Sequence, residues 1–125
     1  MRYFFSYVDS ALKKGNMLHF FPEGVLIPYD NELREFERGA FMHSQKTNCP
    51  ILPIVLCQRK ATGPFKFLKK HGCSFTAYIL EPQYIDGSLK KREAVAELEN
   101  RVYGLMKQTL ENNSDRVVEI KYGEL

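Results

Sequence analysis

Three short apolar runs, each bounded by proline or glycine, place the strongest constraint on the fold. They are "MLHFF" at residues 17–21, "PILPIVLC" at 50–57 and "SFTAYIL" at 74–80. Apolar runs of this length between turn residues are typical of buried strands. All three are much shorter than the roughly 20 residues needed to span a bilayer, so no transmembrane segment is predicted.

Helical patterns surround these runs. Apolar residues recur at helical spacing over residues 2–14 and again over 90–110, and "GAFMHSQKT" at 39–47 is a shorter helix candidate. The resulting order of helices and strands predicts an α/β fold, with a layered, mostly parallel or mixed sheet and flanking helices. A strand–helix–strand unit favours a right-handed crossover, so the first two apolar runs are expected to be parallel.

Composition narrows the class of protein. A chain of 125 residues suits one domain, which we take as residues 1–125. Eighteen basic against 15 acidic residues leave a net charge of only +3. This mild bias fits anionic ligands or an anionic membrane surface, and it lacks the strong basic footprint of a nucleic-acid binder. Three widely spaced cysteines without a CxxC pair favour buried free thiols in a reducing interior over disulfides or a metal site.

The stretch "HFFPEGVL" contains the first candidate site residue, Glu23, between Pro22 and Gly24. Ligands of parallel sheets gather beyond the carboxyl ends of the strands, so a carboxylate here is predicted to line a site. The alternative is a structural carboxylate that accepts hydrogen bonds from backbone N–H groups. A catalytic pair of Glu23 with His19 is a weaker interpretation, and His43 is predicted to be exposed.

Three blocks resemble the glycerolipid acyltransferase family, of which the 1-acylglycerol-3-phosphate acyltransferases are the best known. They are "LKKGNMLHFFPEG", "REFERGAF" and "CPILPIVL", in the family's order, within residues 12–56. The resemblance implies transfer of a fatty acyl group from a thioester, on coenzyme A or acyl carrier protein, to a glycerol hydroxyl. It implies no bound cofactor, because the thioester is a co-substrate. The strand and long helix over residues 74–110 are compatible with the family but unspecific.

The family's catalytic dyad is a His and an Asp separated by four residues, with the His as general base. No His in this chain has an Asp at that spacing. We therefore assign no catalytic residue. The chain is expected to be the C-terminal part of an acyltransferase domain, as a fragment, a truncated product or a degenerate relative. It is also expected to be inactive alone. The alternative is a non-catalytic lipid-binding or interaction module.

The resemblance also assigns an acceptor site for a lysophospholipid or related glycerol phosphate, formed by Phe21, Pro22, Glu23 and Gly24. The family often places a phosphate-binding Arg shortly after this Gly, where the chain has Leu26, which cannot form a charge-assisted bond. Arg34, Arg38 and Lys46 are nearby basic residues, and Arg38 is predicted to bind the phosphate because it aligns with the family's basic position before Gly39. The alternative for Arg38 is a solvated or glutamate-paired surface arginine.

A basic and aromatic loop, "PFKFLKKH" at residues 64–71, contains Lys66, Lys69 and Lys70. It is predicted to make peripheral contact with an anionic membrane, and the alternative is a solvated loop whose phenylalanines point inward. The expected location is intracellular, either cytoplasmic or at the cytosolic face of a membrane. Self-association is also expected if a truncated domain exposes a sheet edge or an apolar face.

Overall fold

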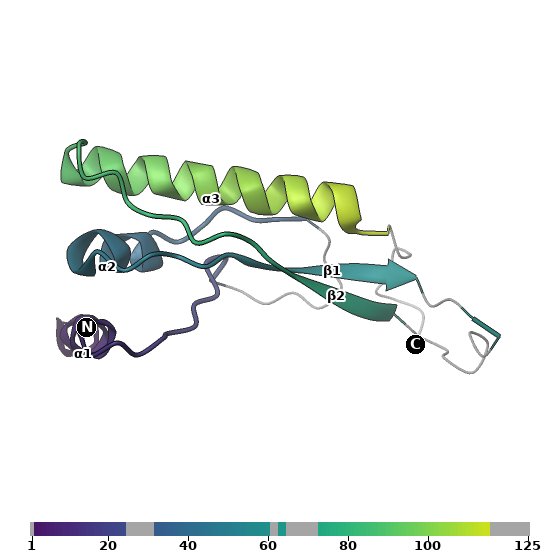
Figure 1. Cartoon of the computed structure of the whole chain (residues 1–125), viewed down its shortest axis with the longest axis horizontal. Helices are drawn as coiled ribbons and strands as arrows, with labels where there is room; N and C mark the ends of the chain where they lie inside the picture. The colour runs from purple at the N-terminus through teal and green to yellow at the C-terminus, as the bar shows by residue number, and fades with distance from the viewer. Residues whose placement is uncertain (1, 25–31, 61–62, 65–72, 116–125) are drawn as a thin grey trace, which may run out of the picture.

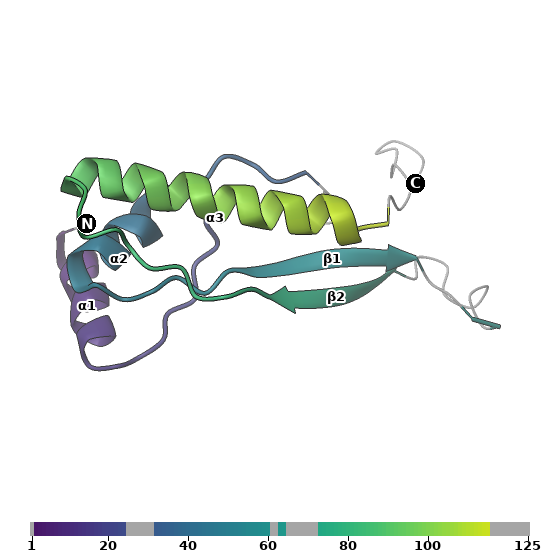
Figure 2. The same ribbon diagram turned by 45° about the horizontal axis from the view of Figure 1, so that its top comes forward.

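The computed structural model describes residues 2–24, 32–60, 63–64 and 73–115 (Figure 1). The elements in chain order are α1 (Arg2–Lys13), α2 (Gly39–Thr47), β1 (Ile54–Lys60), β2 (Cys73–Ile79) and α3 (Lys91–Asn113). Figures 1 and 2 show α3 running along the β1–β2 pair, with α2 between α3 and α1. None of the described helices is long and apolar enough to cross a membrane.

The two strands form an antiparallel pair whose register runs from Ile54 opposite Ile79 to Lys60 opposite Cys73. An isolated bridge between Ile51 and Gln83 extends the pairing, with backbone N–O distances of 2.9 and 2.7 Å. Pro53 interrupts the ladder because proline has no N–H to donate. The first half of "PILPIVLC" is therefore a segment that leads into β1 and is not part of the strand.

The expected parallel arrangement is wrong for the described residues, where the sheet consists of β1 and β2 and is antiparallel. The run at 17–21 forms no strand, and it is not buried, because Met17 is 94% exposed and Phe21 65% exposed. The second and third apolar runs pair with each other instead. Antiparallel neighbours need no helical crossover, so this pairing does not depend on the first run. The fold is a small mixed α and β structure.

The sheet has one covered and one open face. Val55 and Cys57 are buried toward α3, whereas Ile54 and Leu56 are 44% and 61% exposed. In β2, the apolar residues that alternate along one face are also exposed rather than packed. These residues are Phe75, Ala77 and Ile79.

The main core lies between α2, α3 and the segment that precedes α2. Its buried members are Phe36, Phe41, Val95, Leu98 and Val102. The Phe36 ring stacks on Phe41 at 6.0 Å and meets Tyr103 edge-on at 5.1 Å. The α3 members follow the helical spacing predicted from the sequence, so one stripe of α3 faces the core.

Helix α1 ends in a glycine cap. Gly15 has φ +83°, its N–H donates to Leu12 O at 3.0 Å, and Asn16 N–H donates to Ala11 O at 3.1 Å. These two bonds form a Schellman motif, which favours glycine at the left-handed position. Val8 and Ala11 are buried, and α1 contacts α2.

Candidate functional site

The predicted acceptor segment forms a tight turn over residues 21–24. Gly24 N–H donates to Phe21 O at 3.1 Å, and Gly24 has φ +66°, a conformation that glycine adopts without steric cost. Phe21 is exposed, whereas Pro22 and Glu23 are half-buried. The turn follows an extended segment outside the β1–β2 sheet, so Glu23 is not at the end of a strand.

Backbone contacts hold this turn against residues 34–37. Glu37 N–H donates to Pro22 O at 2.6 Å, and Arg34 N–H donates to the Glu23 Oε2 atom at 3.1 Å. Glu23 thus makes the kind of contact expected of a structural carboxylate that holds a neighbouring loop. A role of the same carboxylate in binding a substrate stays a prediction.

Gly24 is the position in this turn where a substitution should have a clear cost. An added Cβ would lie 3.3 Å from the Cγ and Oε1 atoms of Glu37, and φ +66° disfavours L residues. We expect Gly24→Ala to lower the free energy of unfolding, measured in urea, by about 1–2 kcal/mol. Gly87→Ala is the control, because a Cβ at Gly87 meets nothing within 4 Å. Equal losses in both variants would show that the turn is not strained in this way.

Arg38 occupies the N-cap position of α2, and its Nε atom lies 3.0 Å from the Glu99 Oε2 atom of α3. The Arg38 side chain is 59% exposed and that of Glu99 is 17% exposed. Arg38 is therefore a glutamate-paired surface arginine in this structure. A guanidinium has five N–H donors, so one such contact leaves capacity for a phosphate. Phosphate binding by Arg38 stays a prediction.

The other predicted residues contribute less to a site. His19 is exposed, and its ring lies against Phe21 with centroids 4.6 Å apart, as for a surface histidine. Cys57 is buried and Cys49 half-buried, and both are free thiols. Four residues named from the sequence lie outside the described part of the chain, namely Leu26, Lys66, Lys69 and Lys70.

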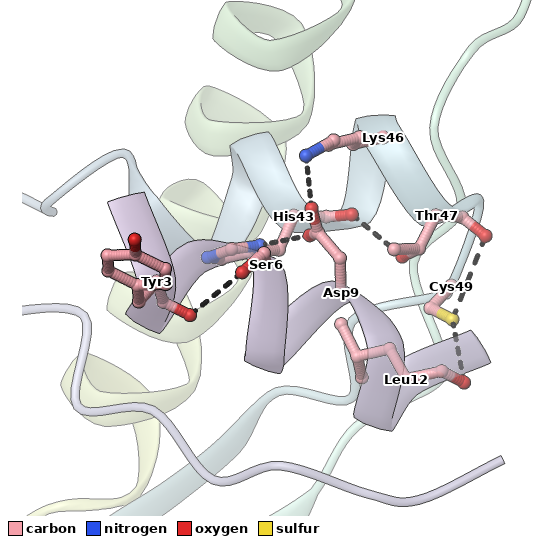
Figure 3. Close-up of polar contacts among 8 residues, drawn as sticks. All are labelled: Tyr3, Ser6, Asp9, Leu12, His43, Lys46, Thr47 and Cys49. Carbon is pink, nitrogen blue, oxygen red and sulfur yellow. Dashed lines mark hydrogen bonds and ion pairs between the residues drawn. The ribbon is translucent and has the colours of Figure 1, made fainter. Parts of the chain in front are cut away.

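The prediction that His43 is exposed is wrong, since it is only 4% exposed. Its Nδ1 atom lies 2.6 Å from the Oδ1 atom of Asp9, which is 5% exposed (Figure 3). Lys46 forms an ion pair with the other carboxylate oxygen of Asp9. A carboxylate only accepts hydrogen bonds, so the imidazole carries a proton on Nδ1. This cluster joins the middle of α1 to α2.

The electrostatics of the cluster favour an ionised carboxylate. The hydrogen bond from Lys46, followed by that from His43, lowers the pKa of Asp9 below its ordinary value of 3.8, although burial opposes the shift. The His43 Nε2 atom is buried without a hydrogen-bond partner, and the ring stacks with Phe5 and Phe20 at 5.2 and 6.1 Å. Aromatic rings thus flank the imidazole. The pair of Asp9 and His43 links α1 to α2.

A sequence signal for this cluster was available. Asp9 falls at helical spacing among Phe5, Val8 and Leu12, on the apolar face of the first predicted helix. A carboxylate on a buried helical face is costly unless another group pairs with it, so a partner could have been expected. The sequence did not indicate that the partner would be His43.

Comparison with known proteins supports part of the sequence interpretation. Residues 1–57 match the model of a protein family described as Acyltransferase. No curated protein and no solved structure matches the chain significantly. The matched segment contains α1, the turn at 21–24, α2 and the first residues of β1, which is consistent with a partial glycerolipid acyltransferase domain. Residues 1–57 of this chain are therefore similar to the acyltransferase family.

Proposed function

We propose that this chain forms the acceptor-binding part of an acyltransferase of glycerolipid biosynthesis. The acceptor is a lysophospholipid or related glycerol phosphate, and the donor is a fatty acyl thioester on coenzyme A or acyl carrier protein. The observation that carries the proposal is the turn at 21–24, which lies in the family-matched segment and is bonded to the chain just before Arg38. The proposal includes an intracellular location with peripheral contact to an anionic membrane, for which Lys66, Lys69 and Lys70 are candidates.

The chemistry of the two candidate side chains fits a phosphorylated alcohol. Arg38 directly follows Glu37, whose N–H bonds to Pro22 of the turn. A guanidinium can bind a phosphate through two parallel charge-assisted hydrogen bonds, and a phosphate would compete with Glu99 for it. The Glu23 carboxylate has about four lone-pair sites, so its bond to Arg34 N–H leaves room to accept a hydrogen bond from a hydroxyl of the acceptor.

We expect the isolated chain to turn over little or no substrate, because no His in it precedes an Asp at the spacing of the family's dyad. Without a general base, the acceptor hydroxyl stays a weak nucleophile. The measurement is thiol release from acyl-coenzyme A in the presence of lysophosphatidate. Robust turnover that is lost in Glu23→Ala would refute this part of the proposal.

Acceptor binding provides the direct test, by calorimetry with a short-chain lysophosphatidate. A hydrogen bond to a charged group contributes about 1.5–3 kcal/mol, so Arg38→Gln should weaken binding by about tenfold or more. Glu99→Gln removes the competing carboxylate and should strengthen binding. Lys107→Gln, at an exposed position of α3, controls for the loss of one positive charge.

The same data separate the proposal from its main alternative. Equal binding by wild type, Arg38→Gln and Glu23→Gln would mean that the lipid does not bind at this turn. Lipid binding that is insensitive to both variants would favour a lipid-binding module with a different site. The combination of weaker binding in Arg38→Gln and tighter binding in Glu99→Gln is expected only for a phosphate at Arg38.

A further inference from the structure

The outer face of α1 has an unusual concentration of exposed aromatic side chains. Tyr3, Tyr7, Ser10 and Lys14 follow the spacing of one helical stripe, and all four are exposed. Among large apolar side chains of the described residues, the most exposed are Met17 at 94%, Tyr3 at 91% and Tyr7 at 73%. Single exposed apolar residues are common, but a cluster on one helix marks an interaction surface.

The charge on this face has one sign. Lys13 and Lys14 are exposed at the end of the helix. The one acidic residue of α1, Asp9, is buried against His43 and Lys46 and contributes no negative charge to the outer face. In Figures 1 and 2, α1 lies beyond α2 and on the opposite side of α2 from α3, so neither α2 nor α3 covers this face.

We propose that the outer face of α1 docks on an anionic phospholipid surface, with the helix lying in the plane of the interface. Tyrosine suits that position because its ring is apolar and its hydroxyl is polar. Lysine extends its aliphatic stem along the boundary and places its ammonium among anionic headgroups. The proposal rests on the surface of α1 and is independent of the acyltransferase chemistry.

A second copy of the chain is a less suitable occupant of this face. A contact of this face with the same face of a second copy would bring two positively charged surfaces together, and α1 has no exposed acidic residue to pair with the lysines, so like charges oppose association. The cores of protein interfaces are also depleted in lysine. An anionic bilayer can accept the aromatic rings at its interface and pair its headgroups with the lysines, so charge complementarity favours a lipid surface over a second copy.

The chain contains no tryptophan, so a single introduced tryptophan reports on one position. With Tyr7→Trp, we expect a blue shift of emission and quenching by brominated lipid on vesicles of phosphatidylcholine and phosphatidylglycerol. Pure phosphatidylcholine vesicles should give much less of both. Tyr84→Trp, at a site that is 63% exposed between β2 and α3, should give neither. An equal shift at Tyr84, or a concentration-dependent shift of Tyr7→Trp without vesicles, would overturn the proposal.

Charge removal tests the electrostatic part by vesicle sedimentation. One lysine near an anionic surface raises the affinity for that surface about fivefold, so Lys13→Gln/Lys14→Gln should weaken vesicle binding by about 30-fold. Lys90→Gln/Lys91→Gln is the matched control, because these lysines are also adjacent and exposed, at the start of α3. Equal losses in both pairs would mean that only net charge matters and would overturn the assignment to α1.

A third variant separates α1 from the basic loop. With Lys66, Lys69 and Lys70 all changed to Gln, the emission shift of Tyr7→Trp on anionic vesicles should persist. If it disappears, while Lys13→Gln/Lys14→Gln binds as the wild type does, the loop is the contact and α1 is not. Thermal unfolding followed by circular dichroism establishes that each variant is folded before it is compared.

Discussion

Replacing Phe41 by Ala is expected to lower the free energy of unfolding by about 3–5 kcal/mol. Phe41 is 1% exposed and belongs to the cluster that joins α2 to α3, where its ring stacks on Phe36. Domains of this kind are stable by only about 5–15 kcal/mol in total, so the variant should be close to unfolding at neutral pH. Alanine has the highest helix propensity, so the loss comes from packing and not from α2 itself.

Phe4→Ala is the matched control for this prediction. It makes the same chemical change in a helix, but Phe4 is 61% exposed. Exposed substitutions away from special features usually change stability by about 0.5 kcal/mol or less. Urea unfolding followed by circular dichroism measures both variants. Similar losses in the two would mean that the α2–α3 cluster is not the main core of the protein.

Local elements could be predicted from the sequence because their signals are local. Gly15 ends α1 through a left-handed cap, and the helical period of α3 identifies the stripe that packs in the core. The α2 segment also has the predicted bounds, Gly39–Thr47. Each of these signals depends on residues within a few turns of one another, so no knowledge of the tertiary structure was needed.

Strand pairing could not be predicted from the sequence, because it depends on which distant segment of the chain is available to pair. The run at 17–21 has the apolar character of a buried strand, yet Met17 is almost fully exposed and the run joins no sheet. The candidate site shows the same limit. The pairing of Arg38 with Glu99 spans 61 positions in the chain, so the residues next to Arg38 in the sequence do not identify its partner.

Asp9→Ala is expected to lower the free energy of unfolding by about 3 kcal/mol. The substitution leaves the buried Nδ1–H group of His43 without its acceptor and removes the ion pair with Lys46. Loss of the carboxylate costs less free energy at Lys46 than at His43, because the Lys46 side chain is 62% exposed and water can solvate its ammonium. Lys46→Met should accordingly cost less than about 1 kcal/mol in the same urea assay.

The stabilisation by Asp9 should also depend on pH. Its pKa is lowered in the folded state, chiefly by the hydrogen bond from Lys46 and then by that from His43. The carboxylate therefore stabilises the fold above the ordinary pKa of 3.8, and this contribution is lost as the pH falls below that value through the folded-state pKa. Asp9→Asn should show a smaller decline in stability over that acidic range than the wild type. Parallel pH profiles would contradict the assignment.

A double variant distinguishes a broken pair from a simple loss of packing. His43→Leu removes the imidazole that Asp9→Ala leaves without an acceptor, so the two losses should not add. We expect a coupling free energy of about 1–3 kcal/mol, with Asp9→Ala/His43→Leu more stable than the sum of the single variants predicts. Additive losses would mean that the two side chains stabilise the protein independently. In that case the junction of α1 with α2 would depend on Val8 and Ala11, the buried apolar residues of α1.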